Sequence, residues 1–269
     1  MKVLPEKTPI ALHFSHVFFS YDHLPVLEDV NFHFHEGEFI ALVGPNGSGK
    51  TTLLKLILGL EKNQRGEVSL FGDQPKRTRS QIGYVPQHAS YDPTFPISVL
   101  EVVRMGMVSA TSFKHSVVDD TAAMDALSQV EIADLCNRSY SELSGGQRRR
   151  VLVARSLVAH PKMLILDEPT ANMDRESETR LFNTLRHLKG KTTILIVTHD
   201  MSVVSSLTDR VFCIGSHHPD HAGRTVVQHK LEPAKSAPPD LYGGEALRVL
   251  HNVELPADIC TFEGDENNG

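Results

Sequence analysis

The chain has 269 residues, of which 40% are apolar and 22% are charged, and its formal net charge is −6. The length suits one large domain or one domain with a modest appendage, and the acidic balance argues against a nucleic-acid-binding surface, which is normally basic. No apolar run approaches the roughly 18 residues of a membrane-spanning helix, and the N-terminus has no apolar signal core, so we expect a protein that stays in the cytoplasm.

The first predicted elements are a β layer, a strand, a loop and a helix. Residues 12–34 alternate between apolar and polar, with a turn at residues 21–23, which predicts an antiparallel β layer. The apolar run at residues 39–43 predicts a buried strand, and the run at residues 52–58 predicts a helix that ends at Gly59. A phosphate-binding loop occurs in this order, between a strand and a helix.

The loop between this strand and this helix has the composition of a phosphate cradle. It carries glycine at the first and sixth of eight places, followed by lysine and threonine: Gly44, Pro45, Asn46, Gly47, Ser48, Gly49, Lys50 and Thr51. Glycines let the backbone turn tightly so that N–H groups point at phosphate oxygens, and the helix N-terminus adds partial positive charge. Lys50 can reach the β- and γ-phosphates, and the Thr51 hydroxyl can ligate Mg²⁺. The pattern therefore predicts a nucleoside triphosphate site that extends to Thr52, with a glycine-rich turn without ligand as the alternative.

A mostly helical insert is predicted at about residues 88–158. Short strands at residues 67–71 and 81–85 come before it, and three prolines then break the strand pattern. Ser98 and Glu101 form a capping box that begins a helix, and apolar residues at helical spacing predict another helix at residues 119–130.

A second glycine-containing helix start lies inside this insert. The segment Leu143-Ser144-Gly145-Gly146-Gln147 precedes a helical run that begins with Arg148-Arg149-Arg150. A serine and two glycines at a helix start form a second phosphate-binding nest, although Ser-Gly-Gly by itself is as often an ordinary linker. We expect the three arginines to form a solvated or surface-paired face, with phosphate binding as the alternative.

Two adjacent carboxylates follow a buried strand. Apolar runs at residues 163–166 and 193–197 predict parallel strands, and a helix predicted at about residues 176–188 joins them into a βαβ unit. Asp167 and Glu168 follow the first of these runs. One carboxylate can hold Mg²⁺ through water while the other orients or deprotonates an attacking water, and a solvated turn is the alternative.

The composition changes after residue 215, where a C-terminal extension is predicted. Residues 232–239 are rich in proline and alanine and predict a linker, and residues 263–269 predict a frayed acidic end. His217, His218, Asp220 and His221 have a spacing that permits metal binding, but a solvated polar loop is the favoured interpretation.

Taken in order, these motifs resemble the ATP-binding subunit of an ABC transporter over about residues 10–215. Residues 143–147 match the family's signature in full, beside the phosphate loop and the paired carboxylates. The resemblance implies that Gln87 contacts Mg²⁺ and the membrane partner, that His199 senses the γ-phosphate, and that Tyr21 stacks on adenine. The family's D-loop falls at residues 171–174, where Asp174 is kept while the three residues before it differ from the common Ser-Ala-Leu.

The resemblance also implies an architecture and a set of site residues. The expected fold is α/β, a P-loop NTPase core of the ABC-ATPase type with a mainly parallel sheet, an antiparallel β layer and a helical subdomain, and residues 216–269 are expected to be a partly flexible extension. A head-to-tail homodimer would hold each ATP between one chain's phosphate loop and the other chain's signature. Catalysis would fall to Lys50, Gln87, Glu168 and His199; ATP binding to Tyr21, the residues from Gly44 to Thr52, Ser144, Gly145, Gly146, Gln147 and Asp174; and Mg²⁺ binding to Thr51, Gln87 and Asp167.

The transported substrate is inferred from two further segments. Residues 82–87 and 92–103, with the late histidines, are similar to the ATPases of zinc and manganese importers. We therefore expect the ATP-hydrolysing subunit of an importer for zinc, manganese or iron, peripheral on the inner face of the cell membrane, with a polytopic permease and an extracytoplasmic metal-binding protein.

Other functions remain as alternatives to a metal importer. Importers of siderophore, haem or cobalamin are the first. A non-transport ABC ATPase of DNA repair or ribosomes is the second, and one cassette, a short insert and the acidic charge argue against it. A purely regulatory nucleotide-binding module is the third, and the presence of Glu168 argues against it.

Overall fold

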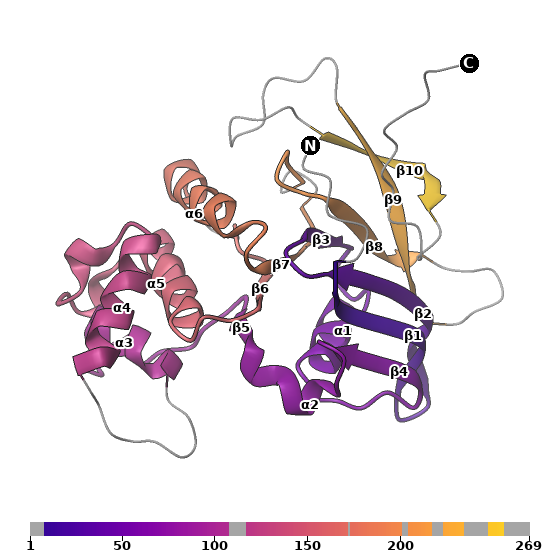
Figure 1. Cartoon of the computed structure of the whole chain (residues 1–269), viewed down its shortest axis with the longest axis horizontal. Helices are drawn as coiled ribbons and strands as arrows, with labels where there is room; N and C mark the ends of the chain where they lie inside the picture. The colour runs from indigo at the N-terminus through magenta and orange to yellow at the C-terminus, as the bar shows by residue number, and fades with distance from the viewer. Residues whose placement is uncertain are drawn as a thin grey trace.

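The computed structural model describes residues 8–107, 117–171, 173–200, 204–216, 223–233 and 247–255. Within these ranges a three-stranded sheet packs against a seven-stranded sheet, and a group of helices lies to one side (Figure 1). This arrangement confirms the α/β class expected from the sequence. No helix in the described ranges is long and apolar enough to cross a membrane.

The three-stranded sheet is the predicted antiparallel layer, with the strand order β2-β1-β4. β1 (Ile10–Tyr21) and β2 (Leu24–His35) form a hairpin, and β4 (Arg65–Leu70) pairs with the other edge of β1. Phe14 and Phe32 are register partners whose rings stack with centroids 4.6 Å apart. Such cross-strand aromatic pairs stabilise a sheet on the face that meets the core.

The seven-stranded sheet has the strand order β10-β9-β8-β3-β7-β6-β5. Its parallel strands in the described chain are β3 (Phe39–Val43), β5 (Ile82–Val85), β6 (Met163–Asp167), β7 (Thr193–Thr198) and β8 (Arg210–Ser216). β3, β6 and β7 are buried on both faces, which explains their near-continuous apolar sequences. Parallel strands end at one edge of a sheet, so the residues that follow β3, β5, β6 and β7 come together there.

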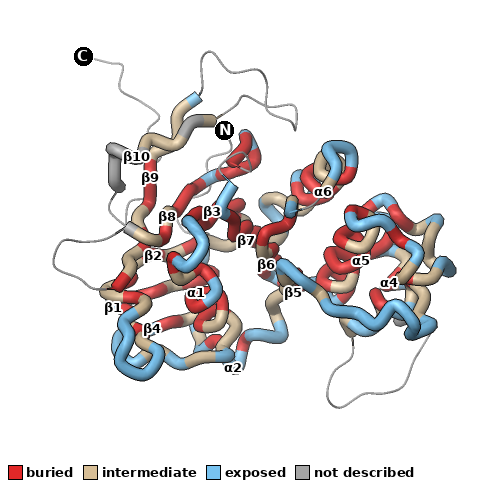
Figure 2. The backbone as a smooth tube through the Cα atoms, turned by 180° about the vertical axis from the view of Figure 1, so that it is seen from behind, coloured by how far each residue is buried: buried red, intermediate tan, exposed pale blue. Residues whose placement is uncertain are grey.

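Other elements cover both faces of the larger sheet. Successive strand residues point to opposite faces, so neighbouring residues of one strand belong to different clusters. The smaller sheet and α1 (Lys50–Ile57) share one core cluster with Ile165 of β6. α5 (Gly145–Leu157) and α6 (Arg175–Leu188) share the other cluster with its neighbour Leu164. Figure 2 shows that buried residues are concentrated in the central strands and in parts of the helices.

The helices of residues 99–157 form their own group beside β5 (Figure 1). α3 (Val99–Arg104) and α4 (Val117–Gln129) pack with α5 around a shared apolar cluster. The predicted capping box begins α3, since the Ser98 N–H donates to Glu101 Oε2 over 2.8 Å. That these helices act as a separate subdomain stays a prediction. The remaining short helices are α2 (Pro75–Thr78), η1 (Arg79–Gln81), η2 (Met105–Met107), η3 (Ala133–Leu135) and η4 (Tyr140–Glu142).

The predicted linker is partly wrong. β9 (Thr225–Pro233) and β10 (Leu247–Leu255) extend the larger sheet as antiparallel strands, so Glu232 and Pro233 lie at the end of a strand. Pairing with β8 and β10 satisfies the backbone groups of β9, and local composition does not report such pairing.

The expected solvated face of three arginines is also wrong for two of them. Arg149 and Arg150 are only 8% and 6% exposed, and their guanidinium groups donate to backbone carbonyls instead of facing water. Other predicted features lie outside the described residues: the histidine cluster at residues 217, 218 and 221 with its Asp220, the D-loop residue Asn172, residues 234–239 of the linker and the acidic end at residues 263–269.

Candidate functional site

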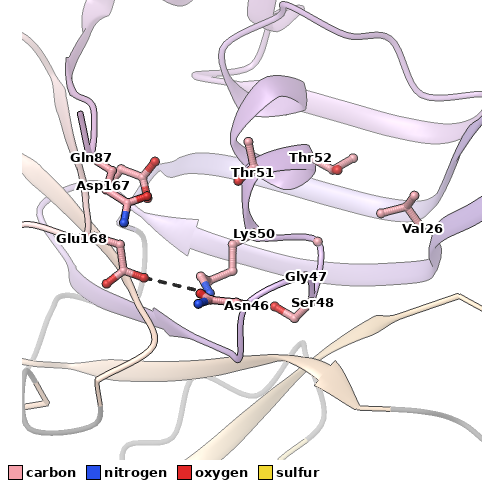
Figure 3. Close-up of a pocket in the computed structure, with 11 residues that line it drawn as sticks. Val26, Asn46, Gly47, Ser48, Lys50, Thr51, Thr52, Gln87, Asp167 and Glu168 are labelled. Atoms are coloured by element: carbon pink, nitrogen blue, oxygen red, sulfur yellow. Dashed lines mark ion pairs between the residues drawn. The ribbon is translucent and has the colours of Figure 1, made fainter. Parts of the chain in front are cut away.

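The loop between β3 and α1 forms one wall of a cavity of about 220 Å³. The opposite wall comes from the residues that follow β5 and β6, in agreement with the shared edge at which these strands end. Figure 3 shows Glu168 facing Lys50, with Asp167 and Gln87 on the same side of the cavity as Glu168. The cavity is lined by Val26, Asn46, Gly47, Ser48, Gly49, Lys50, Thr51, Thr52, Gln87, Asp167 and Glu168.

The loop needs its glycines for both conformation and space. Gly47 and Gly49 have φ angles of 79° and 102°, in the left-handed region that other residues rarely adopt. A Cβ on Gly44 would lie 2.4 Å from the Ile214 carbonyl oxygen, so a side chain there would force β8 away. α1 then begins without a side-chain cap, which leaves its first N–H groups directed at the cavity.

Two features of the loop suit an anionic ligand with many oxygens. The Ser48 hydroxyl is buried and has no hydrogen-bond partner in the described structure, although most buried hydroxyls have one. Thr51, the second residue of α1, is exposed and lines the cavity. Together with the uncapped helix N-terminus, these groups fit phosphate oxygens and a cation bound to them.

Lys50 places a buried positive charge across the cavity from the acidic residues. Its Nζ donates to the Gly44 carbonyl oxygen over 2.6 Å and to the Pro45 carbonyl oxygen over 3.0 Å. It also lies 4.0 Å from Glu168 Oε1 (Figure 3). Burial lowers the pKa of Lys50, and the charges of Glu168 and Asp167 oppose this shift. The ammonium group is therefore held by the loop itself, beside the place where phosphates would bind.

Glu168 is held in a strained and buried position at the end of β6. Its φ angle is 45°, which is unusual for a residue other than glycine, and Glu168 is only 5% exposed. The Thr198 hydroxyl donates to Glu168 Oε2 over 3.0 Å, and His199 Nδ1 lies 2.9 Å from Glu168 Oε1. Backbone strain of this kind persists at functional sites because the surrounding contacts enforce it.

Asp167 is the second carboxylate of the cavity and is also partly buried. Burial raises its pKa, whereas a hydrogen bond of 3.3 Å from the Tyr84 hydroxyl to Oδ2 lowers it. Burial and the nearby Asp167 raise the pKa of Tyr84 to about 12, so this hydroxyl stays protonated and remains a donor.

The structure brings some of the predicted site residues into the cavity and leaves others outside its lining. The phosphate-loop residues from Asn46 to Thr52, Gln87, Asp167 and Glu168 line it, and His199 contacts Glu168. Tyr21 lies in β1 with 37% exposure, and its hydroxyl accepts from Lys55 Nζ over 3.1 Å. The predicted contact of Tyr21 with adenine stays a prediction.

The predicted signature residues and the D-loop residue Asp174 have structural roles at helix starts. Ser144 and Gln147 form a reciprocal capping box on α5, with Gln147 N donating to Ser144 Oγ over 3.2 Å. Asp174 caps α6 by accepting from Ser177 N over 2.9 Å. Gly145 is exposed, whereas Gly146 is buried against α6. None of these residues lines the described cavity of the same chain, and their contacts with ATP stay predictions.

The sequence analysis gave no role at the site to four residues around the cavity: Val26, Tyr84, Thr198 and Arg149. Thr198 comes directly before His199 at the end of a buried strand, and that position is a signal that could have identified it. Arg149 carries no such local signal, because its carbonyl partners are distant in sequence.

Known proteins resemble the chain in sequence and in fold. A family model described as ABC transporter matches residues 27–171. The chain is 44% identical to a protein of Chlamydia pneumoniae named as a probable metal transport system ATP-binding protein, over 70% of the chain and 78% of that protein. It is 41% identical to the zinc uptake system ATP-binding protein of Listeria innocua, over 74% of the chain and 80% of that protein.

Two further matches extend this comparison. The manganese transport system ATP-binding protein of Bacillus subtilis is 38% identical over 72% of the chain and 79% of its own length. The solved structure of cbiO1 from Clostridium perfringens, part of the ABC transporter complex cbiONQ, is 30% identical and superimposes with a TM-score of 0.68, covering 81% of the chain and 87% of that structure.

Proposed function

Since the chain belongs to the ABC transporter family of ATP-binding subunits, we propose that its ATP hydrolysis powers the import of divalent metal cations. The observation that carries the catalytic part is the buried Glu168 carboxylate, held by Thr198 and His199 and facing Lys50 across the cavity. The observation that supports the metal substrate is that relatives 38–44% identical are named for metal, zinc and manganese transport.

The cavity fits a nucleoside triphosphate with Mg²⁺. The N-terminus of α1, the Ser48 hydroxyl and Lys50 would bind the phosphates. Thr51, Gln87 and Asp167 would hold Mg²⁺, because hydroxyl, amide and carboxylate oxygens are ligands that this ion prefers. When bound, Mg²⁺ supplies positive charge that offsets the charge developing on the phosphates.

Glu168 would act as the general base of hydrolysis. The two contacts at 3.0 Å and 2.9 Å leave its carboxylate little freedom, so it can accept a proton from a water molecule placed for in-line attack. Lys50 Nζ stabilises negative charge on the phosphate oxygens in a site partly shielded from water, where such interactions are strong. The side chain of His199 is 55% exposed and that of Glu168 is 6% exposed. His199 therefore contacts the buried base on one side and solvent on the other.

Two such chains would close on ATP as a head-to-tail homodimer. The exposed start of α5, with Ser144 and Gly145, offers N–H groups and a helix dipole to the phosphates of the partner chain. Closing and reopening of this dimer would pass work to a polytopic permease at the inner face of the membrane, with an extracytoplasmic metal-binding protein delivering the cation.

A transport assay tests the metal substrate. The gene is deleted in its own host and uptake of radioactive zinc, manganese and iron is measured under metal limitation, with complementation by the wild type and by Glu168→Gln. We expect uptake of at least one of these ions to fall and to return only with the wild type. Unchanged uptake of all three ions, with loss of siderophore, haem or cobalamin uptake, would replace the metal proposal by that alternative.

A further inference from the structure

Arg149 is a buried cation next to the site with no role in the mechanism described so far. Arg149 lies in the second turn of α5 and is only 8% exposed, and it forms no salt bridge within the described chain. Its guanidinium group instead donates to three backbone carbonyls, those of Pro86, Gln87 and Asp167. Desolvation of a charge is costly, and here the three carbonyls and the nearby negative charge of Asp167 offset it.

The three carbonyls belong to two segments that together make one wall of the cavity. Pro86 and Gln87 follow β5, and Asp167 ends β6, the strand that pairs with β5 through Val85 and Leu166. One terminal nitrogen of Arg149 donates to the first segment and the other to the second. A planar guanidinium group presents these donors in a fixed geometry, so it sets the spacing between the two segments.

The two residues whose backbones Arg149 holds also have side chains in the cavity. Gln87 and Asp167 line it, and they are two of the residues proposed for Mg²⁺. We propose that Arg149 is a positioning residue that sets the placement of Gln87 relative to Asp167 and connects both to α5, the helix that begins at Ser144 and Gly145. The proposal rests on the ATPase function proposed above and adds the contact by which the signature helix and the Mg²⁺ side of the site move together.

The neighbouring Arg150 provides a matched control on the same helix. It is 6% exposed and donates to the Val130 and Glu131 carbonyls over 3.1 Å and 2.8 Å. Neither of these residues lines the cavity. Arg149→Gln and Arg150→Gln therefore remove the same buried charge from the same helix, and only the first removes bonds to the wall of the site.

The test compares Arg149→Gln, Arg149→Lys and Arg150→Gln with the wild type. Measured are kcat, KM for ATP, the Mg²⁺ concentration that half-saturates turnover, and the affinity for a fluorescent ATP analogue in Mg²⁺ and in EDTA. Replacing a residue that positions the ligands of a metal typically lowers the metal affinity by about 10- to 100-fold, so we expect Arg149→Gln to raise the half-saturating Mg²⁺ concentration about tenfold and to lower kcat. Binding of the analogue in EDTA should change by less than about twofold, because the phosphate loop is untouched, and Arg149→Lys should recover part of the loss since it keeps a donor.

The outcomes separate positioning from structural support. Arg150→Gln should keep the wild-type Mg²⁺ dependence even where its melting temperature falls as much as that of Arg149→Gln. Equal Mg²⁺ dependence in the two glutamine variants would overturn the proposal. Should Arg149→Gln not fold, Arg149→Lys and Arg150→Lys replace it, with a raised Mg²⁺ requirement expected only in the first. A wild-type chain without ATP turnover would contradict the proposed function instead, and Mg²⁺-dependent binding of the analogue would still compare the variants.

Discussion

Glu168 combines three properties that few carboxylates share. It is almost fully buried, it has a left-handed backbone conformation, and both of its oxygens have polar contacts. Lys50 Nζ lies 4.0 Å from Glu168 Oε1. The Glu168 carboxylate and the Lys50 ammonium group thus face each other across the cavity. Replacing one should affect a different step of ATP binding and hydrolysis from replacing the other.

We predict that Glu168→Gln keeps ATP binding and nearly abolishes turnover. The amide has the size of the carboxylate but cannot accept the proton of the attacking water, and loss of a general base lowers rates by roughly 10²- to 10⁴-fold. Lys50→Ala should instead weaken binding and hydrolysis together, because it removes a positive charge that faces the phosphates both in bound ATP and in the transition state. Steady-state ATPase assays and equilibrium nucleotide binding distinguish the two, and a glutamine variant with wild-type turnover would exclude Glu168 as the base.

The start of α5 illustrates how one helix end can serve packing and binding at once. Gly145 is exposed, whereas a Cβ on Gly146 would lie 2.2 Å from Ser177 Oγ and 2.5 Å from Ser177 Cβ on α6. The second glycine of the signature therefore allows the two helices to approach closely, and the first remains available to a ligand.

We predict that Gly146→Ala destabilises the fold and that Gly145→Ala does not. Overpacking in a tight contact typically costs about 1–3 kcal/mol, whereas exposed substitutions stay within about 0.5 kcal/mol. Urea unfolding monitored by circular dichroism measures both variants against the wild type. Equal unfolding midpoints for the two variants would show that α5 and α6 adapt freely and that Gly146 has no packing role.

At the scale of the whole molecule, β9 takes part in a hydrogen-bond network that joins the two sheets. β9 pairs with β8, and Arg210 of β8, which is 6% exposed, donates to the Gln228 side chain of β9 and to the His33 carbonyl of β2. Arg210 also lies 3.4 Å from Glu38 Oε2, so a buried network joins both sheets. β9 and β10, which come after residue 216, are thus part of the larger sheet.

We predict that a chain ending at residue 216 is less stable than a chain ending at residue 233. The first truncation removes β9 and leaves buried Arg210 without its Gln228 acceptor, and the second keeps both. Breaking a buried charged network is strongly destabilising, and a loss of about 2 kcal/mol lowers the melting temperature by roughly 4–8 °C at this size. Differential scanning calorimetry of the two truncated chains measures the difference, and identical melting temperatures would contradict a structural role of β9.

We further predict that the exposed signature glycine acts across a dimer. Gly145→Asp should spare nucleotide binding and block ATP-driven dimerisation, because the added carboxylate repels the phosphates of the partner's ATP. Mixing it with Lys50→Ala chains leaves one intact site per heterodimer, so the mixture should regain ATP turnover. Size-exclusion chromatography and ATPase assays follow both effects, and mixtures no more active than either variant alone would argue against the head-to-tail arrangement.

The local chemistry of the chain determined the parts of the site that lie close together in sequence. The phosphate loop, the capping box of Ser98, the helix start at Ser144 and the carboxylates at the end of β6 were all predictable, since each depends on neighbouring residues or on one strand–turn–helix transition. The antiparallel layer was predictable for the same reason, because alternation reports one buried face directly.

Tertiary structure alone decided the features that depend on partners far along the chain. The sequence predicts a solvated face for Arg149 and Arg150. In the structure both are buried, and their guanidinium groups donate to carbonyls 18 to 63 residues away in sequence. β9 read partly as a linker, yet β8 and β10 complete its hydrogen bonds. A charged or polar residue enters the interior only where distant groups satisfy it, and the free energy of that arrangement is set by the packed fold, which local pattern does not describe.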